Sequence, residues 1–304
     1  MDLYPVPDGV ETEAAELFAA EVGGSAGNIA VAMSRQEQPA ALLGALSDDA
    51  VGRFVRFHLE RYGVDTSHCR TIPGAWRTSL AVCETRPADS ETVFYRNGAV
   101  DLQLRAQDVD PSFVGSASFL VVTGTALAAE PSRAAALQAL ALARAAGTFS
   151  VLDVDYRAVS WSDRDETMRV MADAASRCDA VVGNDEEFAL VAGQRCDALA
   201  AARALVAGGA QFAVFKRGSA GSITIAAERS FETGILAVDA MKPFGSGDAF
   251  LGNLLVALRH GLALEQSVRR ASAAAAYVVA RRGCAFAMPT SAELDAFILG
   301  HPSN

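Results

Sequence analysis

The sequence predicts an α/β protein with a mostly parallel β-sheet, helices on both faces of that sheet, and a small β-sheet lid. Three observations support this fold class. From about Leu120 onward, short apolar runs alternate with helix-like stretches, which is the order that builds parallel sheets. Residues 77–104 instead contain two strand-like runs joined by a polar turn. A chain of 304 residues, 51% of them hydrophobic, can also bury a large core.

The alternating half of the chain is predicted to contain four buried strands and two well-defined helices. Each strand is a short run of β-branched and aromatic residues. The predicted strands are Phe119–Thr123, Ser150–Val154, Ala180–Val182 and Phe212–Phe215. The predicted helices are Ser132–Ala146, which Gly147 ends, and Ala198–Ala207.

The lid is predicted from a hairpin pattern. Strand-like runs at Thr78–Glu84 and Thr92–Arg96 flank the polar stretch Thr85–Glu91, which is typical of antiparallel strands. A hairpin is unusual within an α/β order, so we expect it to be inserted over the carboxyl edge of the sheet. Residues 2–22 are expected to add further lid strands. The prediction is therefore one domain, 1–304, with a lid from approximately 2–22 and 77–104.

Composition excludes several classes of function. The net charge of −10 argues against general nucleic-acid binding, which needs basic surfaces. The cysteines and histidines are scattered and suggest neither a disulfide framework nor a metal site. They are Cys69, Cys83, Cys178, Cys196, Cys284, His58, His68, His260 and His301. The sequence shows neither a signal peptide nor a membrane span, so we expect a cytoplasmic location.

The segment Gly245-Ser246-Gly247-Asp248 is the most informative motif, because an apolar helix-like stretch, Leu251–Leu258, follows it. Small residues allow a tight turn whose N–H groups converge, and a following helix adds the positive end of its dipole. Such a turn binds an anion, most often phosphate. A carboxylate at this place is suited to remove a proton from an attacking hydroxyl. The motif therefore predicts phosphoryl transfer, with Asp248 as the base.

Two further motifs leave a structural and a functional interpretation open. Gly23 and Gly24 precede Asn28 and a helix-like stretch, Ile29–Arg35. This is either a turn that begins a helix or a backbone approach to a polyol, with Asn28 bonding its hydroxyls. Asn184 and Glu187 follow a predicted strand, where they either cap a helix or hold Mg²⁺ through water.

Two other groups are similarly ambiguous. Lys216–Gly221 follows the last predicted strand and is either a hairpin turn or a set of N–H groups and cations for ATP phosphates. The pairs Tyr95-Arg96 and Tyr156-Arg157 each follow a strand-like run. Their arginines either meet solvent or recognise a carbonyl-bearing or anionic sugar.

In this order and spacing, these segments resemble the ribokinase/fructokinase-like (PfkB) carbohydrate kinases over essentially the whole chain. The resemblance implies an ATP-dependent kinase that phosphorylates a terminal sugar hydroxyl, with Asp248 as base and the N–H groups of Gly245, Ser246 and Gly247 as the anion hole. The implied sugar-binding residues are Asp2, Gly24, Asn28, Tyr95, Arg96 and Arg157. The implied nucleotide-binding residues are Lys216, Gly218, Gly221, Asn184 and Glu187, the last two holding Mg²⁺ through water. It also implies a homodimer formed through the lid.

Four segments are similar to one subfamily of these kinases, which acts on an inositol-derived keto-sugar. They are Asp2–Pro5, Phe94–Arg96, Lys242–Gly245 and Cys284–Pro289. The stretch Asp153–Arg157 with Trp161 resembles 2-dehydro-3-deoxygluconate kinases, in which the arginine meets the acid sugar. The alternatives are therefore a kinase for that acid or for fructose, and a catalytically silent sugar- or nucleotide-binding protein. A dehydrogenase is disfavoured because no dinucleotide fingerprint follows an early strand.

Two positions depart from the family pattern. Many relatives have an acidic residue, six positions before the base, that helps to hold a monovalent cation, whereas this chain has Lys242. Its ammonium group is expected to replace the ion, which predicts activity without potassium. The family also places the counterpart of Asp2 near the end of a first strand, and almost nothing precedes Asp2 here. We therefore expect Met1 to be an internal methionine of a longer protein; otherwise a sheet strand would be missing.

Overall fold

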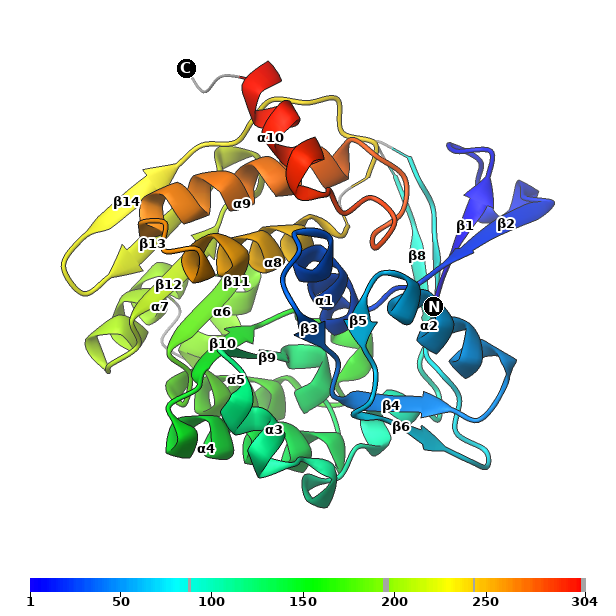
Figure 1. The fold of residues 1–304 in the computed structure, drawn as a ribbon, viewed down its shortest axis with the longest axis horizontal. Helices are drawn as coiled ribbons and strands as arrows, with labels where there is room; N and C mark the ends of the chain where they lie inside the picture. Colours follow the sequence, from blue (N-terminus) through cyan, green and yellow to red (C-terminus); the bar gives the residue numbers. More distant parts are fainter. Residues whose placement is uncertain (87–88, 194–196, 243, 302–304) are drawn as a thin grey trace. The chain divides into compact units, whose positions relative to one another are not determined.

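The computed structural model describes residues 1–86, 89–193, 197–242 and 244–301 (Figure 1). They fall into two compact units: unit 1 is Met1–Asp101 with Ile235–Asn304, and unit 2 is Leu102–Gly234. Each unit has a hydrophobic core of its own. The expectation of a single domain over 1–304 stays a prediction. Cys196, one of the five cysteines, lies outside the described residues.

Unit 2 is built on a six-stranded sheet in the order β14-β13-β12-β11-β10-β9. Strands β9 to β12 are parallel, and β13 and β14 are antiparallel additions. The elements of unit 2 are α3 (Pro111–Ser116), β9 (Phe119–Thr123), α4 (Ser132–Ala146), β10 (Phe149–Asp153), α5 (Arg164–Ser176), β11 (Ala180–Asn184), α6 (Asp185–Ala192), α7 (Ala198–Ala207), β12 (Phe212–Lys216), β13 (Ser222–Ala226) and β14 (Ser230–Thr233). The predicted α/β class with a mostly parallel sheet is confirmed.

Local sequence signals explain most boundaries in unit 2. Strand β9 and helices α4 and α7 have the predicted bounds. Helix α4 ends because Gly147 adopts the left-handed conformation, φ 75°, which glycine tolerates best. Strand β10 begins one residue before its prediction, and β11 and β12 extend beyond theirs, since ladder pairing with neighbouring strands fixes strand ends. Strands β13 and β14 were not predicted.

Unit 1 contains a four-stranded sheet in the order β2-β1-β7-β8. Its elements are β1 (Asp2–Val6), β2 (Leu17–Glu21), α1 (Ser25–Arg35), β3 (Ala40–Ala41), β4 (Gly44–Ser47), α2 (Ala50–Arg61), β5 (Val64–Asp65), β6 (Cys69–Ile72), β7 (Leu80–Cys83), β8 (Thr92–Tyr95), α8 (Ser246–Arg259), α9 (Leu264–Val279) and α10 (Ser291–Gly300). Strands β7 and β8 are antiparallel, so the predicted hairpin is confirmed. Residues 2–22 supply β1 and β2, which pair antiparallel. Among the described residues, short helical turns are η1 (Thr12–Ala14), η2 (Val100–Gln103), η3 (Ala106–Asp108), η4 (Gly124–Leu127), η5 (Ala158–Ser160) and η7 (Gly218–Ala220).

Two predicted helices of unit 1 begin earlier than expected. Helix α1 begins at Ser25 rather than Ile29, and α8 begins at Ser246 rather than Leu251. The apolar pattern underestimated both helices because their first turns carry small polar residues instead of core residues. As a consequence, Asn28 and Asp248 both lie in the first turn of a helix.

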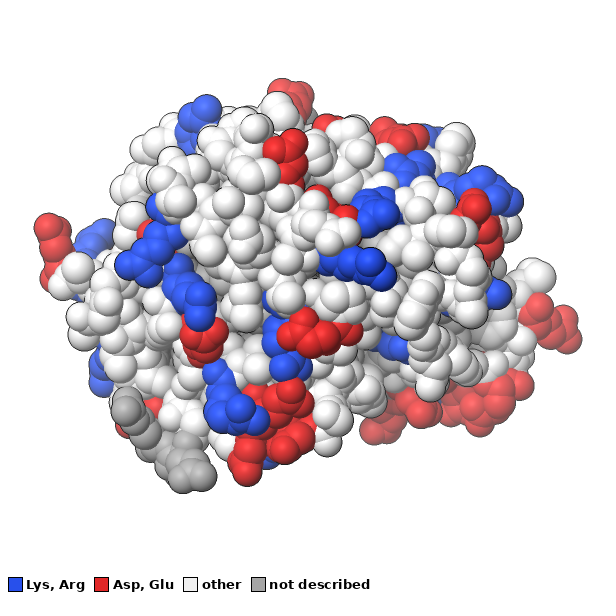
Figure 2. All heavy atoms as spheres, turned by 90° about the horizontal axis from the view of Figure 1, so that it is seen from below, with Lys and Arg blue, Asp and Glu red and all other residues white. Residues whose placement is uncertain are grey.

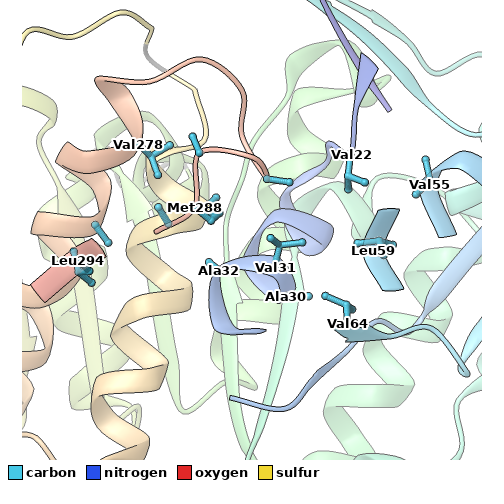
Figure 3. Packing of buried hydrophobic residues seen from close by; sticks show 14 of the residues in the cluster. Val22, Ala30, Val31, Ala32, Val55, Leu59, Val64, Val278, Met288 and Leu294 are labelled. Carbon is cyan, nitrogen blue, oxygen red and sulfur yellow. The ribbon is translucent and has the colours of Figure 1, made fainter. Parts of the chain in front are cut away.

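The core of unit 1 joins α1 to residues from distant parts of the chain. Val31, Leu59, Val64, Met288 and Leu294 are among its buried members, and Figure 3 shows them as sticks between the ribbons. Burial of such side chains stabilises a fold by about 1.5–3 kcal/mol each. This core fixes α1, which supplies residues of the candidate site.

Helix α8 contacts α1 closely at one glycine. An ideal Cβ atom on Gly252 would lie 2.6 Å from the Cβ atom of Ala32 and 3.1 Å from the backbone oxygen of Ile29. Only a residue without a side chain permits this approach. The contact brings the first turns of the two helices together.

In the described part of the chain, none of the helices combines the length and the apolar character needed to span a bilayer. On the face shown in Figure 2, Lys and Arg are scattered among Asp and Glu and do not gather in one basic area.

Candidate active site

The Gly245–Asp248 segment forms the turn that begins α8. Gly245 precedes the helix as its N-cap in the left-handed conformation, φ 82°. It has no side chain that could cap the first N–H groups of the helix, and these groups carry its positive dipole end. A Cβ atom at Gly245 would lie 2.9 Å from Cys284 Sγ. Both the backbone conformation and the available space therefore require glycine here.

Two side chains of α1 bind the Asp248 carboxylate. Ser25 Oγ donates to Asp248 Oδ1 at 2.9 Å, and Asn28 Nδ2 donates to Asp248 Oδ2 at 2.8 Å. Asn28 is thus in contact with the predicted base, which the sequence did not indicate. Ser25 was missed as a site residue. The only signal for it was its place inside the Gly-Gly motif, three positions before Asn28.

Asn28 has a second polar atom that is also buried. The residue is 3% exposed, and its Oδ1 has no hydrogen-bond partner among the described residues. A buried amide oxygen normally accepts a hydrogen bond, and leaving it unsatisfied costs about 1–3 kcal/mol. Asn28 Oδ1 is therefore a buried hydrogen-bond acceptor beside Asp248 that no described residue uses.

Asp2 lies in a pocket that Gly23 makes possible. The carboxylate is 7% exposed and accepts a hydrogen bond from the Tyr4 hydroxyl at 3.2 Å. A Cβ atom at Gly23 would lie 1.9 Å from Asp2 Oδ1, so the first glycine of the motif makes room for this side chain. Burial raises the pKa of Asp2. Asp2 is the first residue of β1, whereas the family pattern placed its counterpart near the end of a strand.

Lys242 is a buried cation close to the turn. It is 1% exposed, its Nζ donates to Phe244 O at 2.7 Å, and Nζ lies 5.0 Å from the centre of the Phe244 ring. Burial lowers the pKa of Lys242, and the neighbouring Cys284, Glu21 and Asp248 act in the opposite direction. Pro243, which stands between Lys242 and Phe244 in the sequence, lies outside the described residues.

The remaining candidates of unit 1 lie on or beside its motifs. Gly24 is the N-cap of α1 with φ 90°. Tyr95 ends β8 and is 58% exposed. Arg96 forms an ion pair with Asp101, so its charge is already engaged by a neighbouring carboxylate.

In unit 2, several candidates meet at the carboxyl ends of the parallel strands. Asn184 on β11 and Lys216 on β12 are direct neighbours in the strand register. Arg157 and its flanking residues follow β10. The carboxyl edge is where α/β proteins bind ligands, and the tertiary structure brings these side chains to that edge.

Asn184 and Glu187 form a reciprocal cap at the start of α6. The Glu187 N–H donates to Asn184 Oδ1 at 2.9 Å, and the Asn184 N–H donates to Glu187 Oε2 at 2.6 Å. Glu187 Oε1 also accepts the N–H of Tyr156 at 3.2 Å. The helix-cap interpretation of this motif is thus confirmed.

Asp155 is a buried carboxylate that the sequence did not single out. It has φ 31°, which is uncommon for a residue with a side chain. Asp155 Oδ1 lies 2.9 Å from Arg157 Nη2, and Thr125 Oγ1 donates to Asp155 Oδ2 at 3.4 Å. Burial raises the pKa of Asp155, although Arg157 and Lys216 oppose the shift. The ion pair between Asp155 and Arg157 orients the half-exposed guanidinium group of Arg157.

The glycines after β12 have different surroundings. Gly218 is exposed, has φ 56°, and has nothing within 4 Å of an added Cβ. Gly221 has φ 80°, is buried, and would place a Cβ only 2.0 Å from Thr233 O. The segment connects β12 to β13 as a hairpin, which confirms the hairpin-turn interpretation. Gly218 is the glycine whose backbone is open to a ligand.

Comparison with known proteins identifies the family. The family model described as "pfkB family carbohydrate kinase" matches residues 1–291. The chain belongs to the pfkB family of carbohydrate kinases. Among curated relatives of this pfkB kinase, 5-dehydro-2-deoxygluconokinase of Photobacterium profundum is 40% identical over 304 residues, covering 98% of this chain and 92% of the relative. The enzyme of the same name from Geobacillus kaustophilus is 36% identical, with 93% and 86% covered.

A solved pfkB-type structure supports the same fold. The fructokinase of Vibrio cholerae O395, in its fructose-, ADP- and calcium-bound form, superposes with a TM-score of 0.82 at 25% identity, covering 97% of this chain and 95% of that one. The carbohydrate-kinase class that the family resemblance implied is therefore confirmed.

The capping geometry decides how Mg²⁺ would fit this pfkB kinase. Asn184 Oδ1 and both Glu187 oxygens already accept backbone N–H groups, which disfavours direct coordination. Each carboxylate oxygen has a second lone pair, and hydrated Mg²⁺ gives up its waters reluctantly. The residues therefore fit a hydrated ion that is held through water.

Proposed function

We propose that this chain is an ATP-dependent kinase that phosphorylates the terminal hydroxyl of 5-dehydro-2-deoxygluconate. The observation that carries the reaction is the Asp248 carboxylate, held by Ser25 and Asn28 directly after a glycine turn. We assign this sugar because curated relatives, one of them 40% identical to this chain, are named 5-dehydro-2-deoxygluconokinase. The candidate sugar-binding residues include the arginines Arg96 and Arg157, which suit an acid substrate.

In the proposed reaction, Asp248 removes the proton of the sugar hydroxyl. The hydroxyl oxygen forms a bond to the γ-phosphorus of ATP while the bond from that phosphorus to ADP breaks. The N–H groups of Gly245, Ser246 and Gly247 donate to the transferring group as charge develops. Losing one such donor typically costs about 3 kcal/mol of transition-state stabilisation.

The sugar would be bound by polar side chains and by one glycine backbone. Asp2 and Asn28 would accept hydrogen bonds from the sugar hydroxyls, and the backbone of Gly24 would approach them closely. Tyr95, at the end of β8, and Arg96, directly after it, would also contribute. Arg157, oriented by Asp155 at 2.9 Å, would meet the carboxylate of the acid, since a guanidinium binds a carboxylate through two parallel hydrogen bonds.

Unit 2 would hold the nucleotide. Lys216 and the exposed backbone of Gly218 would face the phosphates, and Gly221 would maintain the conformation of the hairpin turn. Asn184 and Glu187 would orient Mg²⁺ through water. When bound, the ion would neutralise part of the phosphate charge.

A coupled ADP-release assay tests the function. The panel contains 5-dehydro-2-deoxygluconate, 2-dehydro-3-deoxygluconate and fructose, each at several concentrations. We expect the first to have the highest kcat/KM. A higher value for another sugar would reassign the substrate, and nucleotide binding without turnover on any sugar would identify a silent binding protein.

Asp248→Asn should lower kcat by about a hundred- to ten-thousand-fold while ATP still binds.

We further propose that Lys242 replaces a monovalent cation. Its ammonium group is buried and bonds Phe244 O at 2.7 Å, so a positive charge is already present next to the turn. Turnover should be the same in sodium and in potassium buffers. A steep potassium requirement would contradict this role of Lys242.

We also propose a homodimer formed through the four-stranded sheet of unit 1. Its outer strands expose apolar side chains, including Leu17, which is 67% exposed, and Phe94, which is 38% exposed. Each of these strands exposes neighbouring apolar residues, Leu17 and Phe18 on β2 and Val93 and Phe94 on β8, and contiguous apolar surface often marks an interface.

A further inference from the structure

Two donors from one turn of α1 hold the two oxygens of Asp248. Ser25 and Asn28 are three positions apart, so they project from the same face of the helix. One donates to Oδ1 at 2.9 Å and the other to Oδ2 at 2.8 Å. The close packing at Gly252, where α1 and α8 meet, supports both contacts.

This arrangement controls the rotation of the carboxylate. The terminal torsion of an aspartate side chain is soft and has a broad, twofold distribution. A carboxylate that rotates freely would direct a given lone pair at the sugar hydroxyl only part of the time. A carboxylate offers about four acceptor positions, so two donors can fix its rotation and still leave positions for the incoming proton.

The two donors differ in what else they support. Asn28 is buried within the first turn, and its backbone N–H bonds Gly24 O at 2.9 Å. Ser25 is the first residue of α1 and is only half-buried. Removing the hydroxyl of Ser25 deletes one hydrogen bond to Asp248 with little change in packing, so Ser25 is the better probe.

We propose that Ser25 is a positioning residue whose hydroxyl fixes the rotation of Asp248, so that one carboxylate oxygen faces the sugar hydroxyl. The proposal rests on the proposed role of Asp248 as base. The substrate proton still goes to Asp248, and Ser25 keeps its own proton throughout.

The first experiment compares Ser25→Ala with Ser25→Thr. Because hydrogen bonds to charged groups are the stronger ones, Ser25→Ala should lower kcat about tenfold and leave the KM for ATP unchanged. Ser25→Thr keeps a hydroxyl and should retain kcat within about threefold. Ser34→Ala is the matched control, since Ser34 Oγ in the same helix donates to Tyr62 O at 2.7 Å, and its kcat should equal that of the unmodified chain. Full kcat in Ser25→Ala would overturn the proposal.

The second experiment is a double-mutant cycle with Asp248→Asn. If Ser25 acts through Asp248, Ser25→Ala should cost about tenfold in the unmodified chain but less than about twofold when Asp248 is already replaced. An equal loss in both backgrounds would place the action of Ser25 elsewhere and overturn the proposal. Near-normal turnover of Asp248→Asn alone would instead reject the base, and with it the proposed mechanism. An inactive Asp248→Asn with a fully active Ser25→Ala would reject only the positioning role.

Discussion

Gly245 combines two constraints at a single residue. Its φ of 82° lies in the left-handed region, and an added Cβ would be 2.9 Å from Cys284 Sγ. A side chain here must distort the turn that precedes Asp248. Catalytic geometry is sensitive to shifts of about 1 Å, which can cost on the order of a hundredfold in rate.

Gly245→Ala should therefore lower kcat by at least about tenfold. Adding Cys284→Ala should restore only part of the loss, because it removes the sulfur contact but not the backbone strain. Gly261→Ala is the control: Gly261 has a similar φ of 78°, yet nothing lies within 4 Å of its added Cβ. That control should cost about 1–2 kcal/mol of stability and leave kcat unchanged. Equal kcat values for Gly245→Ala and Gly261→Ala would contradict the role of the turn.

At the scale of elements, the contact between α8 and α1 depends on Gly252. Alanine favours an isolated helix by about 1 kcal/mol over glycine, which would suggest that Gly252→Ala is stabilising. The contact of 2.6 Å with Ala32 Cβ reverses that expectation, because overpacking typically costs about 1–3 kcal/mol.

Gly252→Ala should thus lower the free energy of unfolding, measured by chemical denaturation, and should lower kcat because α1 moves away from Asp248. Gly300→Ala is the matched control, since Gly300 ends α10 with nothing within 4 Å of an added Cβ. It should leave kcat unchanged and should not lower the free energy of unfolding, because alanine is the better helix former. A Gly252→Ala variant as stable and active as the control would show that the helices can separate without consequence.

Glu84 joins two segments around the four-stranded sheet. Its carboxylate accepts the Thr12 N–H at 2.7 Å and the Glu91 N–H at 3.1 Å, and pairs with Arg86 at 2.8 Å. The Thr12 N–H is the largest cause that lowers the pKa of Glu84 from 4.5 to about 2. Because the folded-state pKa is the lower one, the stabilisation is present above pH 4.5 and is lost as the pH falls toward 2.

Glu84→Gln should reduce the free energy of unfolding at neutral pH, and the difference from the unmodified chain should shrink as the pH falls below about 4.5. Denaturation at a series of pH values checks this. Glu13→Gln, which changes an exposed glutamate of η1, serves as control. A difference that is independent of pH would mean that the ionisation of Glu84 does not matter.

At the scale of the whole molecule, the proposed dimer predicts a response to charge on the outer strands of the four-stranded sheet. Phe94→Asp should convert a dimer to a monomer in size-exclusion chromatography with light scattering, because a charge at an apolar interface is costly. Phe57→Asp changes another exposed phenylalanine, 57% exposed on α2, and should leave the mass unchanged. A dimer that survives Phe94→Asp would exclude this sheet as the interface.

The sequence by itself determined the α/β class, the hairpin and the phosphoryl-transfer motif, because these depend on short-range signals. Apolar periodicity, glycine at turns and a carboxylate after a glycine turn are all readable within a few residues. Helix starts were predicted less well, since the first turns of α1 and α8 lack apolar residues.

Only the tertiary structure decided which side chains support the motif. Ser25 and Asn28 reach Asp248 across 223 and 220 positions of the chain, and Gly23 makes room for Asp2 across two strands. Such contacts depend on how α1 packs on α8 and how β1 pairs with β2. The sequence indicated Asp248 as the proposed base, and the packing of two helices determined how its carboxylate is held.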